Sequence, residues 1–469
     1  MFPWKTAFKL ITNHRRPLYL QLSDQFINKI SQGILKSGQK LPGTRQLSQI
    51  LEVNRKTVVK AYEELIGQGW LISVEASGTF ITKDLPILST HALKNRIKNA
   101  NISNDFHTLN QLAYIPLTHE NKRIKIGFDG GSPDQRIAPL DWIYKECKYF
   151  AKSKNGKQLL SYAEPAGLLL LRQVLSDYLG QTRGISSNEE NLMITRGSQM
   201  GIYLAAQILL NQNDIAIVGN TSYDAADWTF RQRGAKLERV EVDQQGMNID
   251  HLEKLCQNKN VRLVYVTPHH HFPTTVTLSS SRRIQLLNLS EKYNFHIIED
   301  DYDYDFHYKR SPILPLASLD RNRRIIYIGS FSKVYAPTIR IGYLVASKYL
   351  VNELSKLRRI IDRQGDHLLQ RVMADSIKNG ELGRHLKKSI MAYRQRRDHL
   401  MHRLVTDFSE NVTFNPPEGG MALWAKFKNV DLLKLKPIIN QMGLAMDMDA
   451  ELAGRYNSLR IGFATVNKQ

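Results

Sequence analysis

The chain has 469 residues, a hydrophobic fraction of 42% and a formal net charge of +21 at pH 7. This length exceeds one ordinary core, so we expect at least two domains. No stretch reaches the roughly 18 apolar residues of a membrane helix, charged residues interrupt the first 20 positions, and Cys147 and Cys256 lack paired spacing. These features exclude membrane-spanning and disulfide-scaffold proteins and predict a cytoplasmic protein with no membrane partner.

The positive charge is concentrated near the N-terminus. Residues 1–82 carry eleven Lys and Arg against five Asp and Glu, a net charge of +6. Residues 83–125 carry seven against three, a net charge of +4. A basic N-terminal quarter favours a polyanionic partner, although a merely soluble basic surface has the same composition.

The N-terminal region reads as three helices followed by a hairpin. Apolar residues recur at helical spacing over residues 20–30, and we expect Thr44 to cap a second, short helix. Asn54 is expected to cap a third helix that begins at Arg55, and residues 69–81 read as two short strands.

Two short helices joined by a tight turn, with a basic start to the second, predict a helix-turn-helix. Arg55 and Thr57 are placed to reach base edges, and Lys56 or Lys60 to contact phosphate. Gly78, at the hairpin tip, allows close approach to the DNA backbone. The expected partner is double-stranded operator DNA.

This region resembles the GntR-type winged helix. The resemblance implies DNA contacts from Arg45, Arg55, Thr57 and Gly78; the alternative is a winged helix that binds protein. The matching positions are Pro17-Leu18-Tyr19, Leu41-Pro42, Arg45, Leu47, Arg55, Thr57-Val58, Ala61-Tyr62, Leu65, Gly69 and Ser77-Gly78-Thr79-Phe80.

Residues 83–125 show no sustained periodicity, and a structureless loop of that length is uncommon inside one domain. We therefore expect residues 1–82 to form the DNA-binding domain, residues 83–125 an interdomain linker with one short helix near residues 90–98, and residues 126–469 an effector domain.

From residue 126 onward, apolar strands alternate with amphipathic helices. The pattern predicts a parallel-rich α/β sheet with its chemistry at the strand ends. The candidate strands are residues 191–195, 214–219, 237–242, 262–267, 295–299, 324–328 and 341–346.

Lys333 follows one of these strands, close to Ser330, Ser332 and Arg340. An amine at the mouth of a sheet, beside hydroxyl and guanidinium donors, suits a phosphorylated cofactor linked through an imine. The alternative is an ordinary surface lysine in a loop.

Other strand ends add complementary groups. Gly197, Ser198 and Gln199 open a helix whose free N–H groups can hold a phosphate. Asp300 can keep a pyridine nitrogen protonated, and the Tyr302 hydroxyl can meet the ring O3′.

Two clusters suggest metals as an alternative. Residues 299–305 are rich in carboxylates, but strand alternation splits them between two faces. His269, His270 and His271 are consecutive and cannot easily converge on one ion. We therefore expect no metal.

Residues 126–469 resemble a fold-type I, class I/II aminotransferase. The resemblance implies pyridoxal 5'-phosphate (PLP) as cofactor, with Lys333 forming the internal aldimine and Asp300 at the pyridine nitrogen. It also implies that Tyr223 stacks on the ring, that Tyr162 reaches the phosphate in a neighbouring subunit, and that Arg460 grips an effector carboxylate. The matching segments are residues 161–167, 197–199, Tyr223, 267–268, 272–274, 299–302, 330–333, 340–342 and 458–463.

The order of the two domains resembles the MocR family of bacterial regulators. It implies a homodimeric, PLP-dependent, sequence-specific transcriptional regulator with swapped domains, nucleoid-associated when bound to DNA. The effector domain would sense PLP or a small amino compound through the Lys333 aldimine. A catalytically active aminotransferase with an accessory DNA-binding domain is the alternative.

Three positions depart from the family pattern. His271, expected at the cofactor, stands where a polar amide is common, and Thr275 replaces a usual glycine. Ala225 occupies the position of a basic effector-binding residue in the GABA-responsive member, which argues against GABA as the effector.

Overall fold

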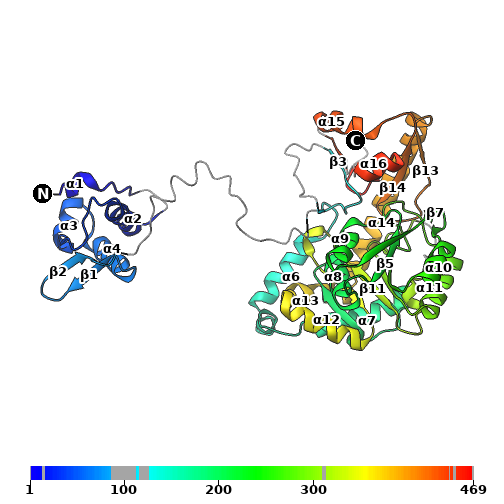
Figure 1. The fold of residues 1–469 in the computed structure, drawn as a ribbon, viewed down its shortest axis with the longest axis horizontal. Helices are drawn as coiled ribbons and strands as arrows, with labels where there is room; N and C mark the ends of the chain where they lie inside the picture. The colour runs from blue at the N-terminus through cyan, green and yellow to red at the C-terminus, as the bar shows by residue number, and fades with distance from the viewer. Residues whose placement is uncertain are drawn as a thin grey trace. The chain divides into compact units, whose positions relative to one another are not determined.

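The computed structural model describes residues 2–12, 16–85, 112, 114–115, 126–308, 313–442, 444–446 and 450–466. The chain divides into two compact units, Met1–Leu109 and Asn110–Gln469 (Figure 1). The helix expected near residues 90–98 lies outside the described residues.

The first unit is a winged helix-turn-helix, as predicted. It contains α1 (Trp4–Ala7), α2 (Leu18–Ser31), α3 (Thr44–Leu51) and α4 (Arg55–Gly67), then the antiparallel strands β1 (Leu71–Val74) and β2 (Gly78–Ile81). Its core is formed by apolar side chains that these elements bury together, including Phe26, Leu47, Val58 and Leu65. Helix α1 was not predicted; the Trp4 and Phe8 rings pack on Phe26.

The two expected helix caps differ in outcome. Asn54 caps α4, because its side chain accepts a hydrogen bond of 2.9 Å from the Lys56 N–H. The prediction of Thr44 as a cap was wrong: Gly43 holds the extended backbone of the cap position, and Thr44 is the first helical residue. No side chain caps the start of α3.

The second unit is built on a seven-stranded sheet. Its order is β4 (Leu192–Thr195), β12 (Gly342–Val345), β11 (Ile325–Ser330), β10 (His296–Asp300), β9 (Val261–Val266), β5 (Ile215–Gly219) and β6 (Lys236–Val240). Strand β12 runs antiparallel to β4 and β11, whereas β11, β10, β9, β5 and β6 pair in parallel. This mixed sheet confirms the predicted α/β class.

Helices cover both faces of this sheet, and most strand residues are therefore buried. One face packs on α8 (Ser198–Leu209), α9 (Asp224–Gln232) and α12 (Lys348–Ile361). The other face packs on α6 (Leu140–Lys152), α7 (Leu169–Arg183), α10 (Ile249–Asn258), α11 (Ser280–Lys292) and α13 (His367–Lys378). Short 3-10 turns lie at Asn155–Leu160, Glu189–Asn191, Leu316–Ser318 and Pro337–Ile339.

A smaller antiparallel sheet of β13 (Val412–Phe414), β14 (Ala422–Phe427) and β16 (Ser458–Gly462) has its own core (Figure 1). The long helix α14 (Glu381–Phe408) and the helices α15 (Leu432–Gln441) and α16 (Ala450–Tyr456) accompany it. Strand β15 (Leu444–Met446) pairs with β3 (Ile126–Phe128), and β7 (Val242–Asp243) with β8 (Gly246–Met247). Within the described residues, no helix has the length and apolar content needed to cross a bilayer.

Candidate functional site

The ends of β10 and β11 place Asp300 and Lys333 at one edge of the large sheet. The two strands are parallel neighbours, with Asp300 opposite Ile328, and the turn after β11 carries Lys333. The Lys333 Nζ donates a 2.8 Å hydrogen bond to the Gly131 carbonyl oxygen. Burial and the nearby positive charge of Arg460 lower the pKa of this amine, which favours its neutral, nucleophilic form.

Asp300 has one oxygen without a partner. Its Oδ2 accepts a 2.8 Å hydrogen bond from the Tyr265 hydroxyl, while its Oδ1 has no hydrogen-bond partner within the described residues. The residue is 3% exposed, and burial raises the pKa of its carboxyl to about 7. A buried acceptor left open in this way suits a ligand that brings an N–H group.

An anion cradle forms where α8 begins. Gly197 has φ of 78°, and a Cβ there would lie 2.9 Å from the terminal nitrogens of Arg340. The Arg340 guanidinium donates a 2.6 Å bond to the Arg196 carbonyl, so it lies against the backbone turn that precedes Ser198. The positive φ favours glycine here, and a side chain would displace the Arg340 guanidinium from its place.

Hydroxyl groups complete the cradle, and Gln199 turns away from it. Ser330 accepts a 3.1 Å bond from the Ser332 N–H, and the buried Ser332 Oγ has no partner within the described residues. The Gln199 amide instead donates to the Ala225 carbonyl and the Thr229 hydroxyl, at 3.1 Å each.

Arg460, on β16, faces the same site. Its guanidinium donates to the Gly130 carbonyl at 2.8 Å, the Pro273 carbonyl at 3.0 Å and the Tyr302 hydroxyl at 3.2 Å. It also lies 5.0 Å from the centre of the Phe272 ring. These are neutral partners, and among the described residues Arg460 forms no ion pair, so its positive charge is available to an anionic ligand.

Two tyrosines line the site between these charges. Tyr223 precedes α9 and meets the Phe272 ring edge-on at 5.5 Å, and burial raises the pKa of its hydroxyl. The Tyr302 hydroxyl donates to the His270 carbonyl at 2.9 Å and accepts the bond from Arg460.

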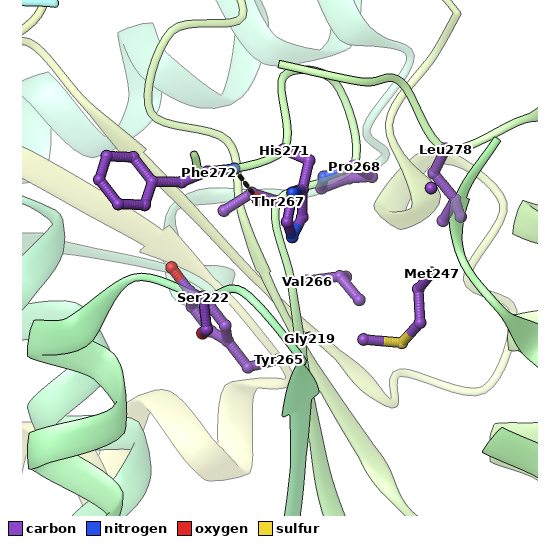
Figure 2. A pocket seen from close by; sticks show the side chains of 11 residues that line it. Gly219, Ser222, Met247, Tyr265, Val266, Thr267, Pro268, His271, Phe272 and Leu278 are labelled. Atoms are coloured by element: carbon purple, nitrogen blue, oxygen red, sulfur yellow. Dashed lines mark hydrogen bonds between the residues drawn. The ribbon is translucent and has the colours of Figure 1, made fainter. Parts of the chain in front are cut away.

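His271 closes the site on a neighbouring loop. Its Nδ1 lies 2.8 Å from the Thr274 hydroxyl, and burial with the charge of Arg460 lowers the pKa of the ring to about 3. His271 and Tyr265 line a cavity of about 20 Å³, room for about one water. Figure 2 shows the side chains around it. Thr275 keeps a left-handed backbone, φ of 62°, without the usual glycine.

Two of the three consecutive histidines pair with carboxylates of residues 299–305. His269 Nδ1 lies 2.9 Å from Asp301 Oδ1, and His270 Nδ1 lies 2.7 Å from Asp303 Oδ1. Glu299 accepts hydrogen bonds from the backbone N–H groups of residues 316 and 317. In the described part of the chain, no cluster of His, Cys, Asp and Glu has the arrangement of a metal site.

One predicted residue lies apart from the site, and two parts of the site were not predicted. Tyr162 is 79% exposed and stacks with the Arg363 guanidinium at 4.1 Å, apart from the groups above. The sequence analysis missed Tyr265 and the residue 130–131 backbone. A tyrosine within the buried run Val264-Tyr265-Val266 of β9, next to the strand that ends at Asp300, was the available signal.

The candidate DNA-binding side chains lie on the surface of the first unit. Arg45, Arg55, Lys56 and Lys60 are exposed, and Thr57 is half-buried. Gly78 is exposed at the start of β2 with φ of 116°.

Comparison with known proteins agrees with both halves of this description. Residues 124–469 match the class I and II aminotransferase family, and residues 18–81 match the gntR family of bacterial regulatory proteins. The uncharacterized HTH-type transcriptional regulator YdfD of Bacillus subtilis is 27% identical and aligns with 96% of this chain and 93% of its own. The probable rhizopine catabolism regulatory protein MocR of Rhizobium meliloti is 27% identical over 88% of this chain and 82% of its own.

The chain belongs to the MocR family.

Solved structures similar to this MocR-type protein include aminotransferases. The kynurenine aminotransferase of Pyrococcus horikoshii, crystallised with PMP, superposes with a TM-score of 0.71 at 28% identity, covering 78% of this chain and 94% of that one. PLP is the typical cofactor of the class I and II family, and GntR-type domains bind DNA.

Proposed function

We propose that this MocR-type protein is a transcriptional regulator that binds operator DNA through its winged helix and PLP through its second unit. A small amino compound or PLP itself is the signal. Two groups at adjacent strand ends support the cofactor half of this proposal: the buried Asp300 Oδ1, which has no partner among the described residues, and the Lys333 amine, whose pKa is lowered.

The residues present fit PLP. Asp300 Oδ1 would accept the pyridine N–H, and Gly197, Ser198, Ser332 and Arg340 would hold the phosphate. Tyr223 would cover the ring, with His271 and Tyr302 near O3′. When bound, PLP supplies an aldehyde that condenses reversibly with amines.

This chain's own residues would select the effector. Burial and the charge of Arg460 lower the pKa of the Lys333 amine, which favours its neutral form. Arg460 would hold a carboxylate through paired hydrogen bonds, since its charge is not neutralised by an ion pair among the described residues. Neutral His271 adds no competing charge.

We further propose that the protein acts as a homodimer with paired half-sites on DNA. The exposed Tyr162 would then reach the phosphate in the neighbouring subunit. Effector binding would change operator affinity only if the effector prefers one of two conformations.

The test compares wild-type protein with Lys333→Ala and the control Lys388→Ala, an exposed lysine on α14. After borohydride reduction, peptide mapping is expected to find a pyridoxyl adduct on Lys333 in the wild type and the control. Lys333→Ala should lose this adduct and the response of operator binding to amino compounds. An unmodified Lys333 together with an unchanged DNA response would contradict the proposal.

An active aminotransferase is the second candidate, because the aromatic-amino-acid aminotransferase 1 of Thermococcus litoralis is 31% identical over 64% of this chain and 73% of its own. Turnover of amino acid and keto acid pairs at roughly 1 s⁻¹ or faster would favour it.

A further inference from the structure

A second cavity, of about 410 Å³, lies between the large and small sheets of the second unit. The loops after β5 and around β7 line one side, and β13, β14 and β16 line the other. The loop of residues 272–276 separates it from the candidate cofactor site. The Pro273 carbonyl contacts Arg460, whereas Thr274 and Thr275 face the cavity. The volume suits a small organic molecule.

Two residues that line this cavity carry buried hydroxyl groups with no hydrogen-bond partner among the described residues. Thr221 is 5% exposed, and its Oγ1 has no hydrogen-bond partner in the described part of the chain. On the opposite side, the hydroxyl oxygen of the half-buried Tyr456 is also buried and has no hydrogen-bond partner among the described residues. Buried polar groups are normally hydrogen-bonded. Neither oxygen is exposed to the cavity, so either would bind a ligand only after its side chain turns toward it.

The charge of the cavity is positive. Lys426, on β14, is exposed and forms no ion pair with any described residue. Asp243 also lines the cavity, but both of its carboxylate oxygens accept hydrogen bonds from Arg282, at 2.6 and 2.7 Å. The Asp243 charge is therefore already neutralised, and Lys426 favours an anionic group on the ligand.

Aromatic rings accompany this charge. Trp424 and Phe414 line the cavity, and Trp424 lies two residues before Lys426 on β14. Alternate residues of a strand share one face about 7 Å apart, so the indole and the ammonium group belong to the same face. A planar ring that carries a carboxylate matches this spacing.

We propose that this cavity is a second binding site, for a hydroxylated aromatic carboxylate. The carboxylate pairs with Lys426, the ring packs on Trp424, and the hydroxyl reaches Thr221 or Tyr456. The Asn415 side chain already donates a hydrogen bond across the cavity to Gln244. A ligand held from both sides ties the small sheet, which carries Arg460, to the large one.

The experiment uses the full chain saturated with PLP and 4-hydroxybenzoate as the ligand, measured by titration calorimetry. This compound has no amine and cannot condense with PLP. Its carboxylate could also bind Arg460, so the Lys426 variant below separates binding in this cavity from binding at the cofactor site. Lys426→Gln is expected to weaken binding about tenfold, and Tyr456→Phe about threefold. Lys428→Gln, an exposed lysine two residues further along, should bind as the wild type does.

The neutral analogue 4-hydroxybenzamide should bind about tenfold more weakly than the acid. Absence of saturable binding up to about 10 mM acid would overturn the proposal. Equal affinity of the Lys426→Gln and Lys428→Gln variants would overturn it as well, as would loss of binding in Lys333→Ala. The visible absorbance of bound PLP checks that the Lys426, Lys428 and Tyr456 variants are folded, and circular dichroism checks Lys333→Ala.

Discussion

At the scale of the residue, Asp300 shows how environment sets chemistry. The sequence placed a carboxylate after a buried strand, which was enough to predict a partner for a ring nitrogen. It showed a tyrosine in a neighbouring buried strand, but not that the Tyr265 hydroxyl bonds one Asp300 oxygen and leaves the other without a partner among the described residues. That asymmetry depends on strand register between β9 and β10, which a single sequence does not reveal.

Asp300→Asn tests this buried carboxyl in the cofactor-free protein. Its pKa is raised to about 7 in the folded state, so its protonated form stabilises the fold, and this stability is lost as the pH rises toward 7. The variant should match the wild type at pH 4 and exceed its free energy of unfolding by up to about 4 kcal/mol at pH 8. Urea unfolding at both pH values measures the difference.

The matched control is Asp177→Asn, an exposed position on α7, which should show no such pH dependence. With PLP bound, Asp300→Asn should have a lower free energy of unfolding than the wild type at pH 8, because the pyridine N–H needs the carboxylate. A stability difference between Asp300→Asn and wild type that stays constant from pH 4 to pH 8 would contradict this explanation.

At the scale of the element, helix α4 was predictable because its cap and first turn are local. Asn54, Arg55 and the apolar face are all readable within a few residues. The start of α3 was misassigned by one residue, because threonine is a good cap and Gly43 takes that role by backbone conformation alone. The antiparallel direction of β12 depends on long-range pairing and was not visible.

Variants in helix α4 should distinguish contacts that read the base sequence from contacts that only attract the charged DNA backbone. Arg55→Ala is expected to cost about 1 to 3 kcal/mol on the operator and little on random DNA, because base contacts carry specificity. Lys56→Gln should weaken both and reduce the slope of log affinity against log salt by about 1. Fluorescence anisotropy over a salt series distinguishes them.

Lys36→Gln, an exposed lysine of the same unit outside α4, is the control and should leave the operator preference unchanged. If Arg55→Ala weakened operator and random DNA equally, the assignment of Arg55 to base edges would be wrong.

At the scale of the whole molecule, the chain holds separate cores. The apolar cluster around Phe26 and Leu47 belongs to the first unit, and the clusters on the two sheets belong to the second. Composition and the loss of periodicity after residue 82 predicted this division into domains. The three-stranded sheet, by contrast, could not be separated from the large one by sequence pattern alone.

The separate cores of the two units predict two heat-absorption transitions. Saturation with PLP at about 100 times its dissociation constant should stabilise the second unit by about 2.7 kcal/mol and leave the winged helix unaffected. Differential scanning calorimetry of the full chain with and without PLP measures this. A single transition that shifts as a whole would show that the units unfold together.

Lys333 follows a strand of the large sheet, whereas Arg460 is part of the small one. In the proposed function, the amine of an effector would bond to the PLP held on the large sheet, and its carboxylate would bond to Arg460 on the small sheet. A compound with only an amine or only a carboxylate would occupy the site without linking the two sheets. Analogues that lack either the amine or the carboxylate are therefore candidate antagonists of this protein.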